Sequence, residues 1–283
     1  MKTVCVIGTG TMGTGIVQAC AQAGYKVFMS DLETEAVSKA IDSVRWALEK
    51  LSAKGLLKGP VGEIAGRISK VESIEEAGSA DLVIEAIIED LDAKQELFIG
   101  LEKSCAENTV LGSNTSSIPI TEIASVLKKP ERVAGIHFFN PVHRMRLVEI
   151  VKGVLTSDET VSRIREFVIS LEKEPVLVNR DSAGFIVNRI NGMAFLEALR
   201  LLEKGIASAQ DIDKAMRLGL GYPMGPFELM DMVGLDVVLA ARMGIYNETR
   251  EPAHFPPDIL RKKVKAGQLG RKSGRGFYHY SEK

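Results

Sequence analysis

The sequence has few of the residues that form disulfides and metal sites. Its 283 residues include three cysteines, Cys5, Cys20 and Cys105, and four histidines. The cysteines lie far apart and form no C-x-x-C pair, so neither a disulfide framework nor a metal site is expected. Cys5 lies in an apolar strand-like run and Cys20 in an apolar helix-like run. Buried thiols of this kind predict a protein of the reducing cytoplasm.

The chain also lacks an excess of charge and a long apolar run. It carries 36 basic and 37 acidic residues, a formal net charge of −1, so no global field attracts nucleic acid or an anionic membrane. No apolar run approaches the roughly 18 residues of a membrane span. The N-terminal MKTVCVIG reaches a glycine before a secretory signal can develop. An acidic ligand must therefore be met by local groups.

Three glycines near the N-terminus form a motif that predicts dinucleotide binding. Gly8, Gly10 and Gly13 give the pattern G-x-G-x-x-G between a β-branched run and a helix-like stretch. In this context Gly8 permits a tight turn, Gly10 lets the backbone approach a pyrophosphate, and Gly13 lets the helix pack on the strand. The helix N-terminus would meet the phosphate charge. We expect this loop, with Thr11 and Met12, to hold the cofactor; the alternative is a glycine-rich turn that binds nothing.

An acidic residue ends the second predicted strand. The run KVFMSD (26–31) follows the glycine motif and ends in Asp31. A carboxylate there can accept hydrogen bonds from both ribose hydroxyls of NAD and would repel the additional phosphate of NADP. Leu32 and Glu33 follow, and no arginine is near enough in the sequence to reverse this preference. The predicted cofactor is therefore NAD.

The two halves of the chain differ in pattern. Strand-like apolar runs alternate with helical segments, one of them expected over 34–57, and the runs lie at 4–7, 26–31, 81–87, 109–113, 132–139, 146–153 and 174–178. This alternation predicts an α/β Rossmann-type domain with a mainly parallel sheet over 1–182. From there on helical segments dominate, which predicts an all-α domain over 183–283. Its first helix, 185–204, is apolar on most faces, as expected in a core or a subunit interface.

A histidine and a glutamate lie in apolar runs that are expected to form successive strands. His137 stands in AGIHFFNPV and Glu149 in RLVEIV. Burying either group costs free energy unless it is paired, so we expect the two to satisfy each other. Such a pair holds one imidazole tautomer and is a candidate general base at the strand ends where ligands bind. The alternative is a structural histidine in the core.

Several longer motifs resemble the 3-hydroxyacyl-CoA dehydrogenase family, in particular its short bacterial members. The resemblance covers nearly the whole chain and rests on GTGTMGTG, DLVIEAIIED, SNTSS, HFFNPV, LVEIV, GFIVNRI, DIDKAMRLGLGYPMGPFELMDMVGLD and GRKSGRGFY. It implies reversible, NAD-dependent oxidation of an (S)-3-hydroxyacyl-CoA, such as the short-chain 3-hydroxybutyryl-CoA, to the 3-oxoacyl-CoA. It also implies a Rossmann-type domain followed by a helical domain that binds substrate and forms a homodimer.

The resemblance assigns roles to individual residues. His137 corresponds to the general acid/base and Glu149 to the residue that orients it. Ser116 and Asn188 correspond to residues that hold the substrate oxygens. The cofactor's nicotinamide end is assigned to Glu89, Lys94, Ser116, Asn140 and Lys272. For Lys94 and Lys272 the alternative of ordinary surface lysines stays open.

Lysines on the predicted helix over 34–57 are candidates for the CoA phosphates. Lys50, Lys54 and Lys58 are spaced four apart, which places them along one helical stripe. The resemblance assigns Lys54 to the CoA nucleotide, and we include Lys50 with it. The alternative is a solvated helix face.

The segment after HFFNPV departs from the family pattern. It reads His143, Arg144, Met145 and Arg146 where the family has small or apolar residues, which leaves the details of substrate binding open. Two other functions also stay open at this point. One is an NAD-dependent dehydrogenase of a free hydroxy acid, and the other is an NAD-binding protein without activity.

Overall fold

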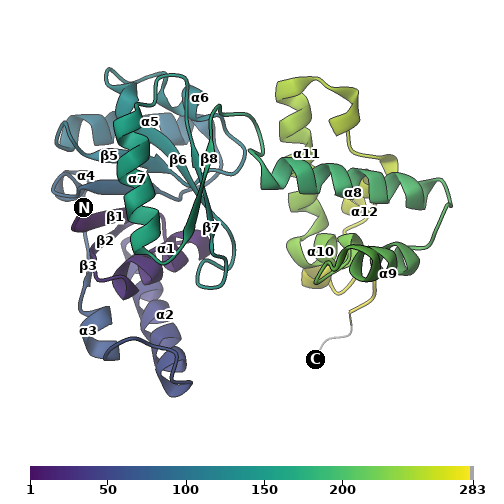
Figure 1. The fold of residues 1–283 in the computed structure, drawn as a ribbon, viewed down its shortest axis with the longest axis horizontal. Helices are drawn as coiled ribbons and strands as arrows, with labels where there is room; N and C mark the ends of the chain where they lie inside the picture. The colour runs from purple at the N-terminus through teal and green to yellow at the C-terminus, as the bar shows by residue number, and fades with distance from the viewer. Residues whose placement is uncertain (281–283) are drawn as a thin grey trace. The chain divides into compact units, whose positions relative to one another are not determined.

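The computed structural model describes residues 1–280. Its contacts divide the chain into two compact units, Met1–Ser182 and Ala183–Lys283 (Figure 1). The last three residues of the predicted second domain, 281–283, lie outside the described residues. Within residues 1–280, no helix combines the length and apolar character that a membrane crossing needs.

The first unit is built on one sheet of eight strands. Their order is β3-β2-β1-β4-β5-β6-β7-β8, where β1 is Thr3–Ile7, β2 Lys26–Ser30, β3 Ile68–Lys70, β4 Leu82–Glu85, β5 Val110–Ser113, β6 Val133–Phe138, β7 Leu147–Val151 and β8 Glu174–Val178. All neighbouring pairs are parallel except β6 and β7, which are antiparallel. The predicted mainly parallel sheet is confirmed. Strand β3 was not predicted, because its three residues, Ile-Ser-Lys, carry no apolar run.

Helices lie in the connections between the strands of this unit, except between β6 and β7, which a loop joins. They are α1 Thr11–Gln22, α2 Thr34–Ala53, α3 Val61–Ala65, α4 Ile74–Ala77, α5 Leu91–Ser104, α6 Ile120–Ala124 and α7 Asp158–Ser170, with a 3-10 turn η1 at Pro130–Arg132. The predicted helix over 34–57 was too long. Lys54 caps α2, and Gly55 follows with φ +67°, a left-handed conformation that glycine adopts readily at helix ends. Lys58 therefore lies outside the helix, and the predicted three-lysine stripe is wrong.

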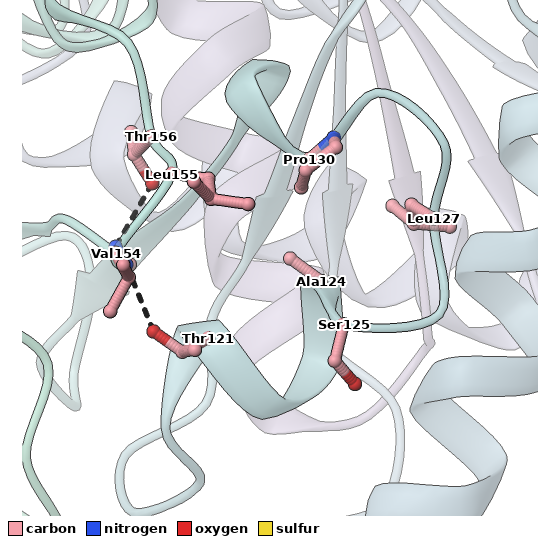
Figure 2. A pocket seen from close by; sticks show the side chains of 9 residues that line it. Thr121, Ala124, Ser125, Leu127, Pro130, Val154, Leu155 and Thr156 are labelled. Carbon is pink, nitrogen blue, oxygen red and sulfur yellow. Dashed lines mark hydrogen bonds between the residues drawn. The ribbon is translucent and has the colours of Figure 1, made fainter.

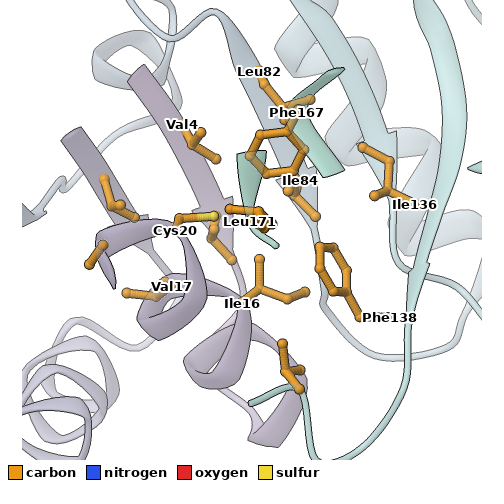
Figure 3. Close-up of a cluster of buried hydrophobic side chains, with 14 of the residues drawn as sticks. Val4, Ile16, Val17, Cys20, Leu82, Ile84, Ile136, Phe138, Phe167 and Leu171 are labelled. Carbon is orange, nitrogen blue, oxygen red and sulfur yellow. The ribbon is translucent and has the colours of Figure 1, made fainter. Parts of the chain in front are cut away.

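The main core lies on one face of the sheet. Figure 3 shows strand side chains such as Val4, Ile84 and Phe138 meeting Ile16 of α1 and Phe167 of α7. Each of these five is at most 2% exposed, and burial of such a side chain contributes roughly 1.5–3 kcal/mol. Because neighbouring residues of a strand point to opposite faces, the side chains between these core positions point to the other face of the sheet.

The second unit is helical. It contains α8 Val187–Glu203, α9 Ala209–Leu220, α10 Pro226–Val233, α11 Leu235–Thr249 and α12 Asp258–Lys265, with 3-10 turns η2 at Pro252–His254 and η3 at Arg271–Ser273. Helix α8 packs against α10, α12 and η2. Phe195, Leu199 and Phe227 belong to a separate apolar core. The predicted helix over 185–204 is confirmed. It begins two residues later than predicted and ends one residue earlier.

Candidate active site

The three glycines of the predicted cofactor loop are needed for different reasons. A Cβ at Gly8, where φ is +115°, would lie 2.3 Å from the carbonyl oxygen of Ala86, and one at Gly13 would lie 2.0 Å from the carbonyl oxygen of Gly8. The fold itself therefore requires these two glycines. A Cβ at Gly10 would meet nothing within 4 Å, whereas a pyrophosphate that approaches the backbone does require glycine there. The loop fits a dinucleotide.

Helix α1 begins directly after this loop. Thr11 and Met12 form its first turn, and the N-cap, Gly10, supplies no side-chain acceptor. The first N–H groups of a helix have no partner within the helix. At the start of a 12-residue helix they are available to a phosphate of the cofactor.

Asp31 lies beside the glycine loop, just past the end of β2. Its Oδ2 accepts hydrogen bonds from the Thr9 amide at 2.8 Å and the Thr9 hydroxyl at 2.7 Å, and its Oδ1 accepts one from the Glu33 amide at 3.2 Å. Burial alone would raise the pKa of Asp31, but these bonds outweigh it and hold the pKa below its ordinary value of 3.8. A carboxylate has about four acceptor positions, so a second ribose hydroxyl would have to replace that of Thr9.

Lys94 is a buried residue of α5. Its side chain is 1% exposed, and its Nζ lies 2.5 Å from Oε1 of Glu85 and 3.3 Å from Oε2 of Glu89. Glu85 is itself fully buried and also accepts hydrogen bonds from the Ser113 hydroxyl and the Ile87 amide. The surface-lysine interpretation of Lys94 is therefore wrong. Lys94 and Glu85 form a buried ion pair at the carboxyl end of β4, and Glu89, whose side chain is 38% exposed, adds a second carboxylate beside Lys94.

Glu89 organises the loop that follows β5. Its Oε1 accepts hydrogen bonds from the hydroxyls of Thr115 and Ser117 and from the amides of Ser116 and Ser117, at 2.7 to 3.1 Å. Burial would raise the pKa of Glu89, but Lys94 and these hydrogen bonds lower it below its ordinary value of 4.5. Glu89 thus fixes the backbone of Ser116, the residue that the resemblance places at the substrate.

His137 and Glu149 face each other across β6 and β7. The antiparallel register puts the two residues directly opposite, so their side chains emerge on the same face. Nδ1 of His137 lies 2.7 Å from Oε2 of Glu149, and the two residues are 5% and 0% exposed. The pair points to the sheet face opposite the α1 and α7 core, because Ile136 and Phe138 point into that core. Phe139 packs on the imidazole with ring centroids 4.5 Å apart.

The other predicted residues of the first unit lie at the surface. They are found either beyond the carboxyl ends of β5 and β6 or on α2. Asn140 is exposed and follows β6 directly, and Ser116 is half-buried in the loop after β5. Lys50 and Lys54 are exposed on the last turn and the cap of α2. The Nζ of Lys50 lies 3.4 Å from the centroid of the Trp46 ring.

Two predicted residues belong to the second unit. Asn188 is half-buried in the first turn of α8, and its backbone carbonyl accepts a hydrogen bond from Arg242 at 2.9 Å. Lys272 in η3 lies 2.7 Å from Oδ2 of Asp236, and its side chain is 47% exposed. Lys272 is therefore a half-exposed lysine that is held by an acid.

Two cavities lie outside the set of predicted catalytic and cofactor residues. One, of about 380 Å³, is largely apolar and lies between α6 and the loop after β7, lined among others by Thr121, Leu127 and Leu155 (Figure 2). The other, of about 400 Å³, is lined by His143 and Arg144 together with Leu57 and Lys173. The segment that departs from the family pattern is thus an exposed wall of this second cavity.

The sequence did not indicate three polar residues that shape the site. Thr9 holds Asp31, Glu85 holds Lys94, and Arg242 holds the start of α8. Glu85 could have been found, because it is the one charge inside the apolar run VIEAI and a buried charge needs a partner. Thr9 and Arg242 give no such signal, since both stand among residues that also fit a loop or an exposed helix face.

The fold and the site define a dinucleotide-dependent dehydrogenase. The first six strands follow the doubly wound order, and the glycine loop, the acid after β2 and the His–Glu pair fit this class. The family model described as "3-hydroxyacyl-CoA dehydrogenase, NAD binding domain" matches residues 3–182, and that described as "3-hydroxyacyl-CoA dehydrogenase, C-terminal domain" matches residues 184–280. The chain belongs to the 3-hydroxyacyl-CoA dehydrogenase family.

Known proteins similar to this chain agree with that assignment. It is 43% identical over 284 residues to the probable 3-hydroxybutyryl-CoA dehydrogenase of Bacillus subtilis (strain 168), covering 100% of this chain and 99% of the relative. It is 42% identical to the 3-hydroxyadipyl-CoA dehydrogenase of Escherichia coli (strain K12), covering 99% of this chain and 59% of the relative. The crystal structure of (S)-3-hydroxybutyryl-CoA dehydrogenase from Ralstonia eutropha has a TM-score of 0.96 at 41% identity, covering both chains fully. The predicted family, fold class, enzyme class and NAD cofactor are confirmed.

Proposed function

We propose that this chain interconverts short-chain (S)-3-hydroxyacyl-CoA and 3-oxoacyl-CoA, with 3-hydroxybutyryl-CoA and acetoacetyl-CoA as a representative pair. The observation that carries the proposal is the buried hydrogen bond between His137 and Glu149 on β6 and β7. A histidine held in this way, at the edge of a sheet that carries a dinucleotide loop, is suited to proton transfer next to a hydride transfer.

The proton step is assigned to His137. In this assignment Glu149 accepts a hydrogen bond from the Nδ1–H of His137, which leaves Nε2 as the ring atom that exchanges a proton with the C3 oxygen of the substrate. In oxidation Nε2 takes the proton of the hydroxyl, and in reduction it returns it to the developing alkoxide. Glu149 supports the protonated ring in both directions. Ser116 and Asn188 donate hydrogen bonds to the substrate oxygens and orient C3.

The cofactor is assigned to the first unit and to one lysine of the second. The backbone from Gly8 to Gly13 holds the pyrophosphate, and Asp31 accepts the adenosine ribose hydroxyls. The nicotinamide ring, when the cofactor is bound, would accept the hydride in its oxidised form, NAD, and supply it in its reduced form, NADH. Residues proposed to surround that ring are Glu89, Lys94, Ser116, Asn140 and Lys272. The two carboxylates around Lys94 give this region a net negative charge, which favours the oxidised, cationic ring.

The CoA phosphates are assigned to the end of α2. Lys50 and Lys54 are exposed and lie one turn apart, so both can reach one polyanion. The use of a CoA thioester as substrate distinguishes this function from the two alternatives, a dehydrogenase of a free hydroxy acid and an NAD-binding protein without activity. A dehydrogenase of a free hydroxy acid needs no such cations, and a protein without activity needs no paired histidine.

The proposal is tested by NADH oxidation with acetoacetyl-CoA, run beside free acetoacetate. We expect rapid turnover of the thioester only, and a fall of roughly a hundredfold or more in His137→Ala. The matched control is His143→Ala, which removes an exposed histidine six residues further along the same segment. Equal turnover of the free acid would favour the hydroxy-acid function. Intact NADH binding without turnover would make His137 a structural histidine.

We further propose that the protein acts as a homodimer in the cytoplasm. The helical second unit exposes large apolar side chains, such as Leu218 and Leu220 at 77% and 66%, which favours a subunit contact there. Cys5, Cys20 and Cys105 are free and buried, and burial raises the pKa of Cys5 to about 12. Thiols kept in this state are consistent with a reducing compartment.

A further inference from the structure

The single tryptophan of the sequence lies on the solvent face of α2. Trp46 is 59% exposed, although it stands in the interior of a 20-residue helix. The side chains that α2 buries include Val44 and Leu48. Each is two residues from Trp46, and two residues turn a helix by about 200°, so the indole points away from the core. Packing therefore does not explain a large aromatic side chain at this position.

A cation already lies on one side of the indole ring. The Nζ of Lys50, one helical turn further along α2, is 3.4 Å from the centroid of the Trp46 ring. Such a cation–π contact occupies a single face of the ring. More than half of the residue is still exposed, so the ring also offers surface to a ligand.

Two lysines beside this ring are available to an anion. Lys50 and Lys54 are exposed, and within residues 1–280 neither has a carboxylate oxygen within 4.0 Å. Glu49 is an exposed neighbour on the same helix that pairs with neither lysine. Lys58, in contrast, is already paired with Glu172 at 2.5 Å. The last turns of α2 thus present an aromatic ring and two uncompensated cations, spaced four residues apart along one side of the helix.

We propose that Trp46 stacks on the adenine of the CoA thioester and is a specificity-determining residue for the nucleotide end of the substrate. This rests on the proposed function, in which Lys50 and Lys54 hold the CoA phosphates. In CoA one ribose carries the adenine, the 3′-phosphate and the diphosphate, so the base lies one sugar away from the phosphates. Four residues rise about 6 Å along a helix, which is comparable to the span of that sugar.

The contact between Lys50 and the ring favours binding of the whole nucleotide. Because the lysine side chain already lies against Trp46, less of its rotamer freedom is lost when a phosphate arrives. Stacking of a base on an aromatic side chain strengthens binding about fivefold or more. If Trp46 served only to stabilise α2, its loss would affect substrates with and without a nucleotide equally.

The first test compares substrates with and without the nucleotide. NADH oxidation is measured with acetoacetyl-CoA and with acetoacetyl-pantetheine, which keeps the thioester arm and lacks the nucleotide. In Trp46→Leu the ratio of the two kcat/KM values should fall about fivefold or more, mainly through KM for acetoacetyl-CoA. Trp46→Phe keeps a smaller ring and should lie between. The matched control is Arg45→Gln, which changes an exposed residue about 100° around α2 and should leave the ratio unchanged.

The second test uses the fluorescence of Trp46 itself. Since the chain has no other tryptophan, the emission reports this one side chain. Adenosine 3′,5′-bisphosphate is titrated with NAD in excess, so that the cofactor site is occupied, and a stacked base should quench the emission saturably. Inorganic pyrophosphate, which carries phosphates and no base, controls for an effect at Lys50 alone and should quench clearly less.

The outcomes separate this inference from the proposed function. An unchanged ratio in Trp46→Leu overturns the inference, and an equal loss with both substrates would make Trp46 a structural residue of α2. Equal quenching by pyrophosphate, or none by the adenosine bisphosphate, also overturns it, and this measurement needs no variant. No turnover of either thioester would overturn the proposed function, whereas saturable quenching would still place an adenine on Trp46.

Discussion

At the scale of single residues, one hydrogen bond decides how His137 can act. Glu149 holds Nδ1 at 2.7 Å, so Glu149→Gln should leave the ring in place but remove the charge that supports its protonated form. We expect kcat for acetoacetyl-CoA to fall about a hundredfold or more, with a smaller change in KM. The control is Glu174→Gln on β8, whose 67% exposed side chain pairs with Arg146. A loss under about threefold in a folded Glu149→Gln would make the pair structural.

The choice of cofactor also depends on one side chain. Asp31 is ionised at neutral pH and lies beside the cofactor loop. Asp31→Ser should lower the ratio of kcat/KM with NADH to that with NADPH by at least about tenfold, because it removes both the ribose acceptor and the repulsion of the additional phosphate. Glu33→Ser, two residues away and exposed, should leave the ratio unchanged. An unchanged ratio in Asp31→Ser would place the discrimination elsewhere.

The sequence predicted some of these residues better than others. His137 and Glu149 were noticeable because each is a polar residue in an apolar run, and two such groups on neighbouring strands need each other. Lys94 gave no such sign, since its helix is amphipathic and a lysine there fits a surface position. Its burial follows from Glu85 and Glu89, which the fold brings to it. Arg242 was invisible for the same reason, because its burial depends on Gly192 of another helix.

At the scale of elements, the glycines of the turn after β1 and of the first turn of α1 have two different roles. Gly13 is required by the fold, whereas Gly10 is required by the proposed cofactor. Gly13→Ala places a Cβ 2.0 Å from the carbonyl oxygen of Gly8. Relieving this clash requires the backbone to move, which costs more free energy than the rotation of a side chain. We expect Tm to fall by about 4 °C or more. Gly10→Ala has open space and a φ of −63°, so Tm should stay within about 2 °C while KM for NADH rises about tenfold or more. Equal NADH binding in Gly10→Ala would contradict a pyrophosphate at this turn.

The loop after β5 should give the protein part of its acid sensitivity. The pKa of Glu89 is below 4.5 in the folded protein, so its contribution to stability is complete above that value and is lost as pH falls through the folded pKa. The difference in Tm between wild type and Glu89→Gln should therefore be largest above about pH 5 and shrink toward about pH 3. Thermal unfolding at several pH values measures it. A difference that is constant over this range would show that Glu89 stabilises the loop without its charge.

Local pattern predicted the types of these elements better than their limits. The parallel strands could be predicted from apolar runs, and the alternation of these runs with helices predicted a parallel sheet. The end of α2 was missed, because the apolar spacing continues through Leu56 and Leu57 while Gly55 turns the backbone left-handed. Strand β3 was missed because a three-residue edge strand is defined by its hydrogen bonds to β2, and these leave no mark in the sequence.

At the scale of the whole molecule, the surface of the second unit predicts assembly. Its exposed large apolar side chains include Ile190, Ile206, Leu218, Leu220, Met232, Val233 and Val237, which are 45% to 77% exposed. A monomer that left all of them in water would be prone to aggregate. Burying them between two copies also fits the usual two-fold symmetry of homo-oligomers.

Sedimentation of the full chain should therefore give about twice the 30.8 kDa of one copy. Leu218→Glu combined with Leu220→Glu should shift the mass toward one copy, because two charges in an apolar contact cost several kcal/mol once buried. The matched control is Ile169→Glu on α7 of the first unit, which is 56% exposed and should leave the mass unchanged. A wild type that sediments as a single copy at all concentrations would contradict the dimer. A variant that stays dimeric would move the contact away from the end of α9, to the remaining apolar side chains of α8, α10 and α11.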